Sequence, residues 1–245
     1  MLHITDTRTG THAELAPGRL TRIDAHPTGA DTPTAVRVLL VADVLARALE
    51  LAGAPVRTGL VAPDLPAEVR AHATALGIRP PDAQGDPARL ARELGGGPGI
   101  RVCPAGGGTE DDGGVRVEVA DAGWPQGADG SGPDPSVLRL ALLTHPCGTP
   151  LHLTAERLAA AGEALARRRK AVARWADAPS RPVPDAVRHE LRDAWEDDLD
   201  VPAVLGVLER LERDDDLPPG ALFETFVYAD RLLGLELARD IGRTP

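Results

Sequence analysis

Several kinds of side chain are scarce in this sequence, and each scarcity argues against a class of protein. Aromatic residues make up only 2% of the 245 residues, which leaves few rings for stacking on nucleic-acid bases. The chain has 27 basic and 37 acidic side chains, so its net charge is −10 and its field repels phosphate groups. Nucleic-acid binding is therefore less expected than other functions.

Cysteine is also scarce, and long apolar runs are missing. Cys103 and Cys147 are the two cysteines, and they form no CxxC motif and no cysteine–histidine cluster at zinc-finger spacing. This argues against a disulfide framework or a structural zinc site and favours reduced thiols in the cytosol. The first fifteen residues lack a basic region followed by an apolar run, and no segment reaches the roughly 18 apolar residues that span a bilayer. We expect a cytoplasmic protein with no membrane segment.

Residues 20–121 alternate between predicted strands and helices. The predicted strands are 20–28, 54–63, 100–106 and 115–121, and the predicted helices are 33–53, 65–77 and 86–97. Pro33 suits the first turn of its helix, and Gly53 and Gly77 suit helix ends. The alternation predicts a parallel sheet of the α/β class.

From residue 136 the pattern is helical almost to the end. The predicted helices are 136–145, 152–178, 184–198, 201–214 and 218–239, with Thr154 as an N-cap. Apolar residues recur on one face of the last two helices, as in an antiparallel bundle. The predicted fold class is α/β, with a reduced Rossmann-type parallel sheet domain at 1–135 followed by an α-helical bundle domain at 136–245.

The glycine-rich segment 106–114, GGGTEDDGG, has the composition of a phosphate-binding loop only at first sight. Such a loop needs glycines that lead into a helix, with a lysine or a helix N-terminus ready for the phosphate. Here a glutamate and two aspartates follow the glycines. We interpret the segment as a solvated hairpin loop between two strands.

Four segments, in order along the chain, carry a resemblance to a known family. They are AHPTGADTPTAVRVLLVADVLARALELAGAPV (25–56), ALGIRPPD (75–82), DPSVLRLALLTHPCGTPLHLTAERLAAAGEAL (134–165) and DAWEDDLDVPAVLGVLERL (193–211). Together they resemble cysteinyl-tRNA synthetases, class I enzymes with a Rossmann-type catalytic domain followed by helical domains. The first segment retains Pro27, Thr28, Arg37, Asp43, Val44 and Leu45 of the family pattern.

The chain departs from this family at the residues that handle ATP. Where the family has the two histidines and the glycine of its HIGH motif, this chain has Thr32, Ala35 and Thr34 respectively. The histidines stabilise charge on the ATP phosphates, and one such electrostatic contribution is typically worth a factor of about a hundred or more. In place of the family's KMSKS loop stands GWPQGADGSG (123–132), and the one lysine of the chain is Lys170. The resemblance implies that the second half of the catalytic domain was deleted and its ends were joined by a flexible linker.

The zinc site of the family also has no counterpart. Its first cysteine ligand falls at Ala25, beside His26, and the segments that carry the other ligands are not found. Thiolate and imidazole groups hold a tetrahedral zinc ion, so we expect no metal here. No cofactor is assigned, and the altered HIGH motif argues against ATP binding.

Two sets of polar residues are candidates for binding, and no catalytic residue is assigned. A ligand pocket at the carboxyl edge of the sheet, where open α/β sheets bind ligands, would use His26, Thr28, Asp31, Thr32 and Arg37. A contact with tRNA or a partner would use Arg167, Arg168, Arg169 and Lys170. The simpler interpretations are ordinary loop and helix residues for the first set and a solvated helix C-terminus for the second.

An acidic cluster raises a further possibility. Glu196, Asp197, Asp198 and Asp200 could hold a divalent cation. A similar acidic run in the family caps a helix junction, and we favour that role. The run Asp214 to Asp216 is interpreted as a solvated turn.

Three functions stay open. The first is a truncated, catalytically degenerate relative of cysteinyl-tRNA synthetase that binds a small-molecule ligand, a protein partner or a second copy of itself. A sheet without its second half would expose an apolar edge, which favours association. The second is an enzyme that activates an amino acid with ATP or transfers one from a carrier, as relatives that ligate cysteine to a small amine do. The third is a tRNA-binding accessory factor.

Overall fold

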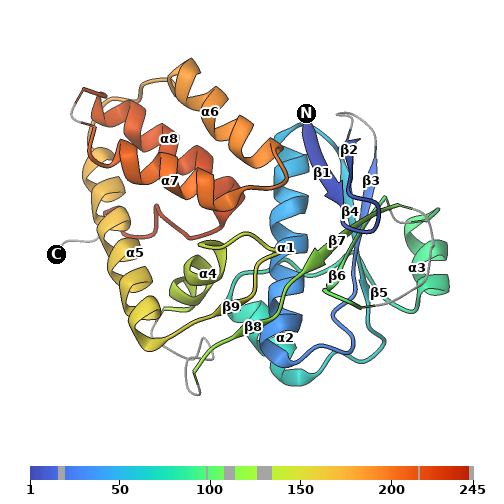
Figure 1. Cartoon of the computed structure of the whole chain (residues 1–245). Coiled ribbons are helices and arrows are strands. Elements are labelled where there is room, and N and C mark those ends of the chain that lie inside the picture. The colour runs from blue at the N-terminus through green and yellow to red at the C-terminus, as the bar shows by residue number, and fades with distance from the viewer. Residues whose placement is uncertain (16–19, 98, 108–113, 126–133, 215, 243–245) are drawn as a thin grey trace.

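The chain folds into an α/β part and a helical part that share one long central helix (Figure 1). The computed structural model describes residues 1–15, 20–97, 99–107, 114–125, 134–214 and 216–242. Residues 126–132 of the predicted flexible linker, most of the predicted hairpin loop and Asp215 lie outside these residues. No helix within the described ranges is both long and apolar enough to cross a membrane.

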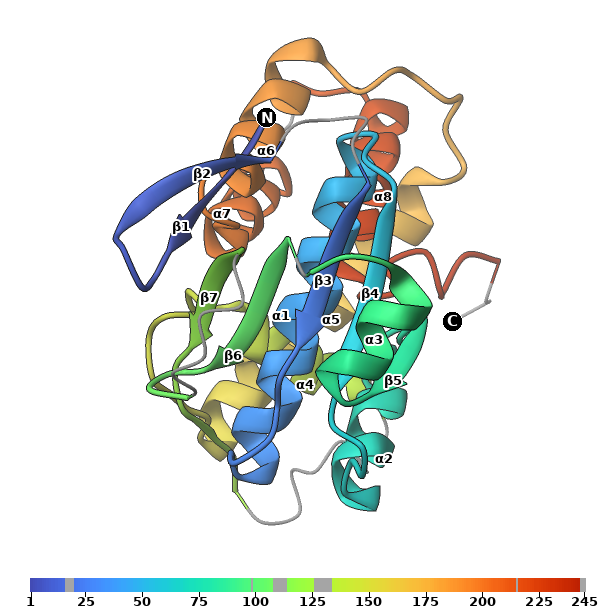
Figure 2. The same ribbon diagram turned by 90° about the vertical axis from the view of Figure 1, so that its right-hand side faces the viewer.

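The α/β part is built on a five-stranded parallel sheet, which confirms the predicted fold class. Its strands, in spatial order, are β5 (Ala83–Gly85), β4 (Val56–Val61), β3 (Thr21–Ala25), β6 (Ile100–Pro104) and β7 (Val115–Val119). The order reverses between β3 and β6, as in Rossmann-type sheets. The crossover helices are α1 (Thr32–Leu51), α2 (Ala67–Ala75) and α3 (Pro87–Leu94). Figure 2 shows α1 on one face of the sheet and α3 on the other.

The connection between β6 and β7 corrects the prediction of a hairpin. These strands run parallel, with Ile100 beside Val115 and Pro104 beside Val119. The chain must therefore return along the length of β6 before β7 begins, which a tight turn cannot do. The glycine-rich composition of the loop was compatible with either geometry.

Sequence analysis missed an N-terminal hairpin. β1 (Leu2–Asp6) and β2 (Thr11–Leu15) pair antiparallel, and Leu2 and Ile4 are buried. The backbone N–H of Thr7 donates to the carbonyl of Arg116 on β7 at 2.9 Å. The hairpin thus packs beside the last strand of the sheet.

Helix α1 lies between the sheet and the helical part, and fifteen of its twenty residues are buried. The helical part contains α4 (Pro135–Leu143), α5 (Ala155–Trp175), α6 (Asp185–Glu196), α7 (Val201–Leu211) and α8 (Pro219–Leu233). The short strands β8 (Ala122–Gly123) and β9 (Leu151–His152) pair in parallel and join the two parts. Buried apolar residues of both parts form one continuous core.

Two helix ends show how local sequence sets the boundaries. Thr154 caps α5, as predicted, and its hydroxyl accepts the N–H of Arg157 at 3.3 Å. Helix α8 ends at Leu233 rather than at Arg239, because Gly234 adopts a left-handed conformation with φ of 63°. A side chain at Gly234 would also collide with the guanidinium of Arg139, at 2.9 Å from the added carbon.

Candidate functional site

The carboxyl ends of β3 and β6 form the edge at which a Rossmann-type sheet binds ligands. His26 follows β3, and its backbone N–H donates to the carbonyl of Val102 on β6 at 2.8 Å. The Thr28 hydroxyl donates to the carbonyl of Val61 on β4 at 3.2 Å. The predicted site residues of this loop are therefore at the edge, tied to the strands on both sides.

The N-terminus of α1 stands at the same edge. Asp31 caps the helix, and its carboxylate accepts the N–H of Thr34 at 3.0 Å. The Thr32 hydroxyl lies 3.3 Å from a carboxylate oxygen of Glu68 on α2, to which it donates. The Thr34 hydroxyl accepts the N–H of Ala122 at 3.1 Å. Asp31 and Thr32 thus lie with His26 and Thr28 in one region, where α2 and β8 also meet α1.

Arg37 lies one turn further along α1 and is buried, with only 1% of its surface exposed. Its guanidinium donates to three carbonyls, those of Ala120 at 3.0 Å, Thr149 at 2.8 Å and Pro146 at 2.8 Å. Burial lowers the pKa of Arg37 below its usual range. The side chain joins α1 to the segments after β7 and α4. A contact of Arg37 with a ligand stays a prediction from the sequence.

The described loops at this edge carry acidic side chains and no lysine or arginine. The described residues that follow β3, β4, β6 and β7 are 26–34, 62–66, 105–107, 114 and 120–125, and none of them is a lysine or arginine. The same residues include Asp31, Asp64 and Asp121. Glu68 adds a carboxylate beside Thr32. The charge at this edge therefore opposes the approach of a polyphosphate.

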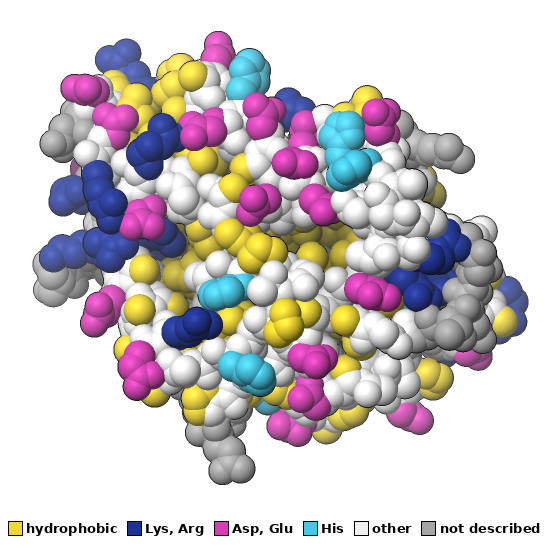
Figure 3. Space-filling view, viewed as in Figure 1, with side chains coloured by type: hydrophobic (Ala, Val, Ile, Leu, Met, Phe, Trp, Pro, Cys, Tyr) yellow, Lys and Arg dark blue, Asp and Glu magenta, His cyan; other side chains and the backbone are white. Residues whose placement is uncertain are grey.

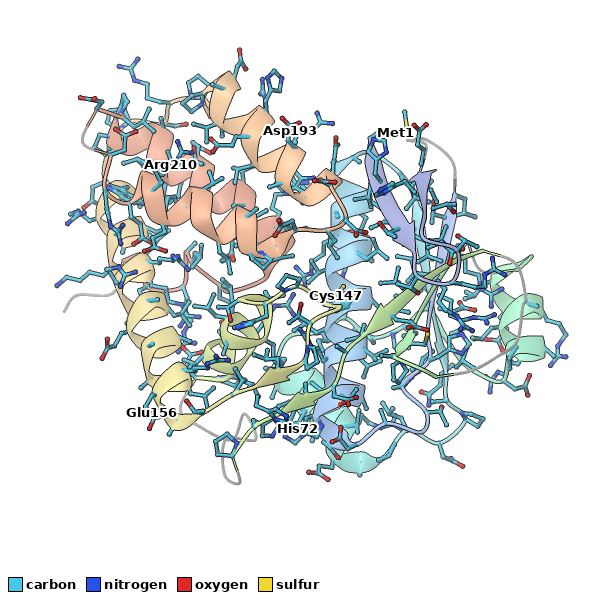
Figure 4. All side chains as sticks on the ribbon, viewed as in Figure 1. Met1, His72, Cys147, Glu156, Asp193 and Arg210 are labelled. Atoms are coloured by element: carbon cyan, nitrogen blue, oxygen red, sulfur yellow. The ribbon has the colours of Figure 1, made fainter. Side chains whose placement is uncertain are left out.

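Sequence analysis missed a buried histidine next to this edge. His72 of α2, labelled in Figure 4, is 5% exposed and lies with its ring centroid 5.5 Å from that of Trp124. Its Nδ1 is 2.8 Å from the carbonyl of Glu68, so Nδ1 carries the proton and donates. Within the described part of the chain, Nε2 has no hydrogen-bond partner. This nitrogen is an acceptor suited to a hydroxyl or thiol, and nothing in the sequence around His72 distinguishes it from other helix residues.

The predicted basic cluster is not a continuous basic face. Arg167 and Arg168 both donate to Glu212, at 3.0 and 2.6 Å. Arg169 pairs with Asp134 and also donates to the carbonyls of residues 235 and 236. Arg168 and Arg169 are buried, while Arg167 and Lys170 are exposed. The turn lies in the interior of α5, which ends at Trp175, so the interpretation as a helix C-terminus is wrong.

The contact between Asp134 and Arg169 gives a testable pH dependence. Burial would raise the pKa of Asp134, but hydrogen bonds from Arg169 and from the N–H of Ser136 hold that pKa below its usual range. The charged carboxylate therefore stabilises the fold above its unfolded-state pKa of about 3.9, and this contribution is lost as the pH falls through the lower folded-state pKa. We expect Asp134→Asn to be less stable than the wild type at pH 7, and we expect the difference to shrink below about pH 4. Urea unfolding of both proteins at pH 7 and below about pH 4 measures this difference in the free energy of unfolding. An equal difference at the two pH values would contradict the expectation.

The acidic cluster makes contacts within the protein. Glu196 pairs with the N-terminal ammonium and with Arg192, Asp198 accepts the N–H of Thr5 at 2.9 Å, and Asp200 caps α7. The favoured role as a helix-junction cap agrees with the Asp200 contact. Nowhere in the described ranges do three His, Cys, Asp or Glu side chains gather closely enough to hold a metal ion. Ala25, at the position of the family's zinc-binding cysteine, is a buried alanine with no donor atom in its side chain.

The expected apolar sheet edge is not exposed. The N-terminal hairpin packs beside β7, and the large hydrophobic residues that are exposed in the described ranges are Met1, Leu20 and Ile241. Figure 3 instead shows hydrophobic side chains gathered in a hollow across the middle of one face. A cavity of about 640 Å³ lies between the end of α4, α5 and α7, and Ala160, Ala164 and Leu205 are among its lining residues. One accessible apolar surface is thus in the helical part.

Comparison with known proteins places this chain near a group of cysteine ligases. No family model matches the chain. It is similar to L-cysteine:1D-myo-inositol 2-amino-2-deoxy-alpha-D-glucopyranoside ligases of three bacteria. Identity to that of Streptomyces griseus is 39% over 113 residues, which are 43% of this chain and 26% of the relative.

Two further relatives with the same name show similar coverage. The Streptosporangium roseum enzyme is 39% identical over 108 residues, which are 42% of this chain and 26% of the relative. The Acidothermus cellulolyticus enzyme is 36% identical over 107 residues, which are 44% of this chain and 26% of the relative. The match thus spans about a quarter of the length of these curated relatives. The chain is therefore similar, over less than half of its own length, to proteins named as cysteine ligases, which are the relatives cited for the second of the three functions that the sequence left open.

Proposed function

We propose that this protein is a cysteine-ligase-like and cysteinyl-tRNA-synthetase-like protein that acts by binding a ligand or a protein partner and does not activate an amino acid with ATP. The proposed ligand site is the carboxyl edge of the sheet, formed by His26, Thr28, Asp31 and Thr32 with His72 behind them. A small polar ligand there would meet carboxylates and hydroxyls, and the buried Nε2 of His72 lies behind them.

One observation carries this proposal, namely that the described loops around the N-terminus of α1 contribute no lysine or arginine to meet phosphates. Formation of an adenylate develops negative charge on the ATP phosphates, which enzymes stabilise with cationic groups and aligned hydrogen-bond donors. Here the described edge loops contain no lysine or arginine, and Glu68 stands beside Thr32. The nearest arginine along α1, Arg37, donates to three backbone carbonyls.

The alternative of an ATP-dependent cysteine-activating enzyme is favoured by the names of the relatives, all of which are cysteine ligases. The N-terminus of a long helix also offers backbone N–H groups to an anion. In this protein the Asp31 carboxylate accepts one of them, that of Thr34. A tRNA-binding accessory factor has weaker support, because Arg168 and Arg169 are buried in ion pairs.

A thermal-shift screen separates these functions, because a ligand that binds the native state raises the melting temperature. The probes are cysteine, magnesium–ATP, a cysteinyl-sulfamoyl-adenosine mimic of the adenylate, and total tRNA. We expect no shift with ATP, the mimic or tRNA. A shift with cysteine alone would assign cysteine to the edge, and no shift with any probe would leave a protein partner as the binding target.

The variant Glu68→Arg tests directly whether the charge at this edge weakens the binding of phosphates. It replaces a carboxylate beside Thr32 with a cation and should raise the affinity for inorganic triphosphate by about tenfold, since one favourable charge contact of about 1.4 kcal/mol has that effect. The matched control is Glu224→Arg, which makes the same exchange on α8, in the helical part. Triphosphate binding by the wild type as tight as by Glu68→Arg would contradict the proposal, as would a shift with the adenylate mimic.

A further inference from the structure

A second candidate site lies on the face of the sheet in the α/β part and reaches the edge described above at Ala25 and Leu65. It is a cavity of about 610 Å³ lined by strands β3 to β5, by α1 and α2, and by the segment 78–82. Its floor is apolar and buried, formed by Ile23, Ala25, Leu39, Ala42, Ala46 and Leu60. None of His26, Thr28, Asp31, Thr32 and Arg37 lines it. This volume and apolar lining are those of small-molecule sites.

The segment 78–82 forms the outer wall of the cavity and is held in place by polar contacts. Both the backbone N–H and the side-chain Nε–H of Arg79 donate to Asp43 on α1, at 3.3 and 3.1 Å. The same guanidinium donates to Glu50 at 2.7 Å. Pro80 and Pro81 fix the backbone that follows. The wall is therefore anchored to α1 beside the floor, so the space is preformed.

The charges around the cavity identify the polar end of its ligand. The lining contains five charged residues, Asp43, Glu50, Arg70, Arg79 and Asp82. Asp43 and Glu50 pair with Arg79, and Asp82 accepts the N–H and hydroxyl of Thr58 and lies 3.9 Å from Arg57. Only Arg70 has no carboxylate partner in the described part of the chain.

Arg70 is placed to receive an anion. Its guanidinium is exposed and makes one long contact, to the carbonyl of Leu65 at 3.4 Å. Thr74 lies one turn further along α2, is also exposed, and lines the same cavity. An unpaired guanidinium at the rim of an apolar space complements a carboxylate that carries an apolar chain.

We propose that this cavity binds a monocarboxylate with an apolar chain, which lies on the floor formed by β3, β4 and α1 while its carboxylate pairs with Arg70. The candidate residues at the edge of the sheet do not line this site, and the inference does not depend on the function proposed for them.

Isothermal titration with octanoate tests the proposal, with octanol and octylamine as probes of the same chain that lack the negative charge. We expect octanoate to bind most tightly and octylamine most weakly. Arg70→Met keeps the apolar stem of the side chain and should weaken octanoate binding by about tenfold while leaving octanol unchanged. Ala73→Phe, which fills the cavity from α2, should abolish binding of both.

The matched control is Arg92→Met, which removes an exposed arginine from α3 on the other face of the sheet and should bind octanoate like the wild type. Unfolding curves establish that each variant is folded. Failure of folded wild-type protein to bind octanoate at millimolar concentration would overturn the proposal. Binding that Ala73→Phe does not weaken would overturn the location, and binding that Arg70→Met does not weaken would overturn the assignment of an anion.

Discussion

Replacing Arg139 with methionine is expected to lower the free energy of unfolding by about 3–5 kcal/mol, the range for breaking a buried, hydrogen-bonded charge pair. Arg139 of α4 has no exposed surface and donates to Asp43 of α1 at 2.8 Å. It also donates to the carbonyls of Leu233 at 2.6 Å and Leu76 at 3.0 Å. One guanidinium thus joins four segments of the chain. Methionine would leave the carbonyls of Leu233 and Leu76 without this donor and would remove one of the three arginines that pair with Asp43.

Urea unfolding at pH 7 measures this loss. The matched control is Arg188→Met on α6, whose side chain is 46% exposed and pairs with Asp185 three residues away. An exposed pair of this kind contributes little, so the control should stay within about 0.5 kcal/mol of the wild type. A loss below about 1 kcal/mol in Arg139→Met would contradict the role that we assign to this residue.

Replacing Arg37 with methionine is expected to cost about 3 kcal/mol and to lower the melting temperature by roughly 6–12 °C. The three carbonyls of residues 120, 146 and 149 would lose their shared donor. The cost is smaller than the upper range for Arg139, because the loop 146–149 has exposed residues and water can reach part of it.

Differential scanning calorimetry of Arg37→Met tests whether the residue holds the structure or binds a ligand. The control is Arg57→Met, which removes an arginine that is 56% exposed and has its carboxylate partner at 3.9 Å. If Arg37→Met melted like the wild type but lost a ligand that the wild type binds, the residue would be a ligand-binding group and our assignment of a structural role would be wrong.

The sheet could be predicted because its strands and helices are regular and local. The apolar spacing of α1, the proline in its first turn and the glycine after its end all lie within one stretch of sequence. Strand direction was harder, because a glycine-rich loop between β6 and β7 fits a hairpin or a crossover, and only the pairing of Ile100 with Val115 distinguishes them. The N-terminal hairpin was missed although Leu2, Ile4 and Asp6 alternate as buried positions, since its second strand, β2, has no buried position and only two apolar residues, Ala13 and Leu15.

Side-chain contacts between distant segments could not be predicted from the sequence. Arg139 and Asp43 are 96 residues apart, and Arg169 and Asp134 are 35 apart, so no local pattern pairs them. Arginines that look like a solvated basic turn are partly buried, because carboxylates from distant helices reach them. The cavity under α2 was likewise not predicted, since it depends on how Arg79 anchors the segment after α2 to α1.

We propose that the edge at the N-terminus of α1 does not support activation of an amino acid with ATP. Cysteine-dependent exchange of pyrophosphate into ATP measures this activity, because it reports reversible adenylate formation without need of the acceptor. With a cysteine ligase as positive control, we expect exchange no faster than the background without protein. Exchange that requires both cysteine and this protein, and that changes in Glu68→Arg, would show instead that the protein is a cysteine-activating enzyme.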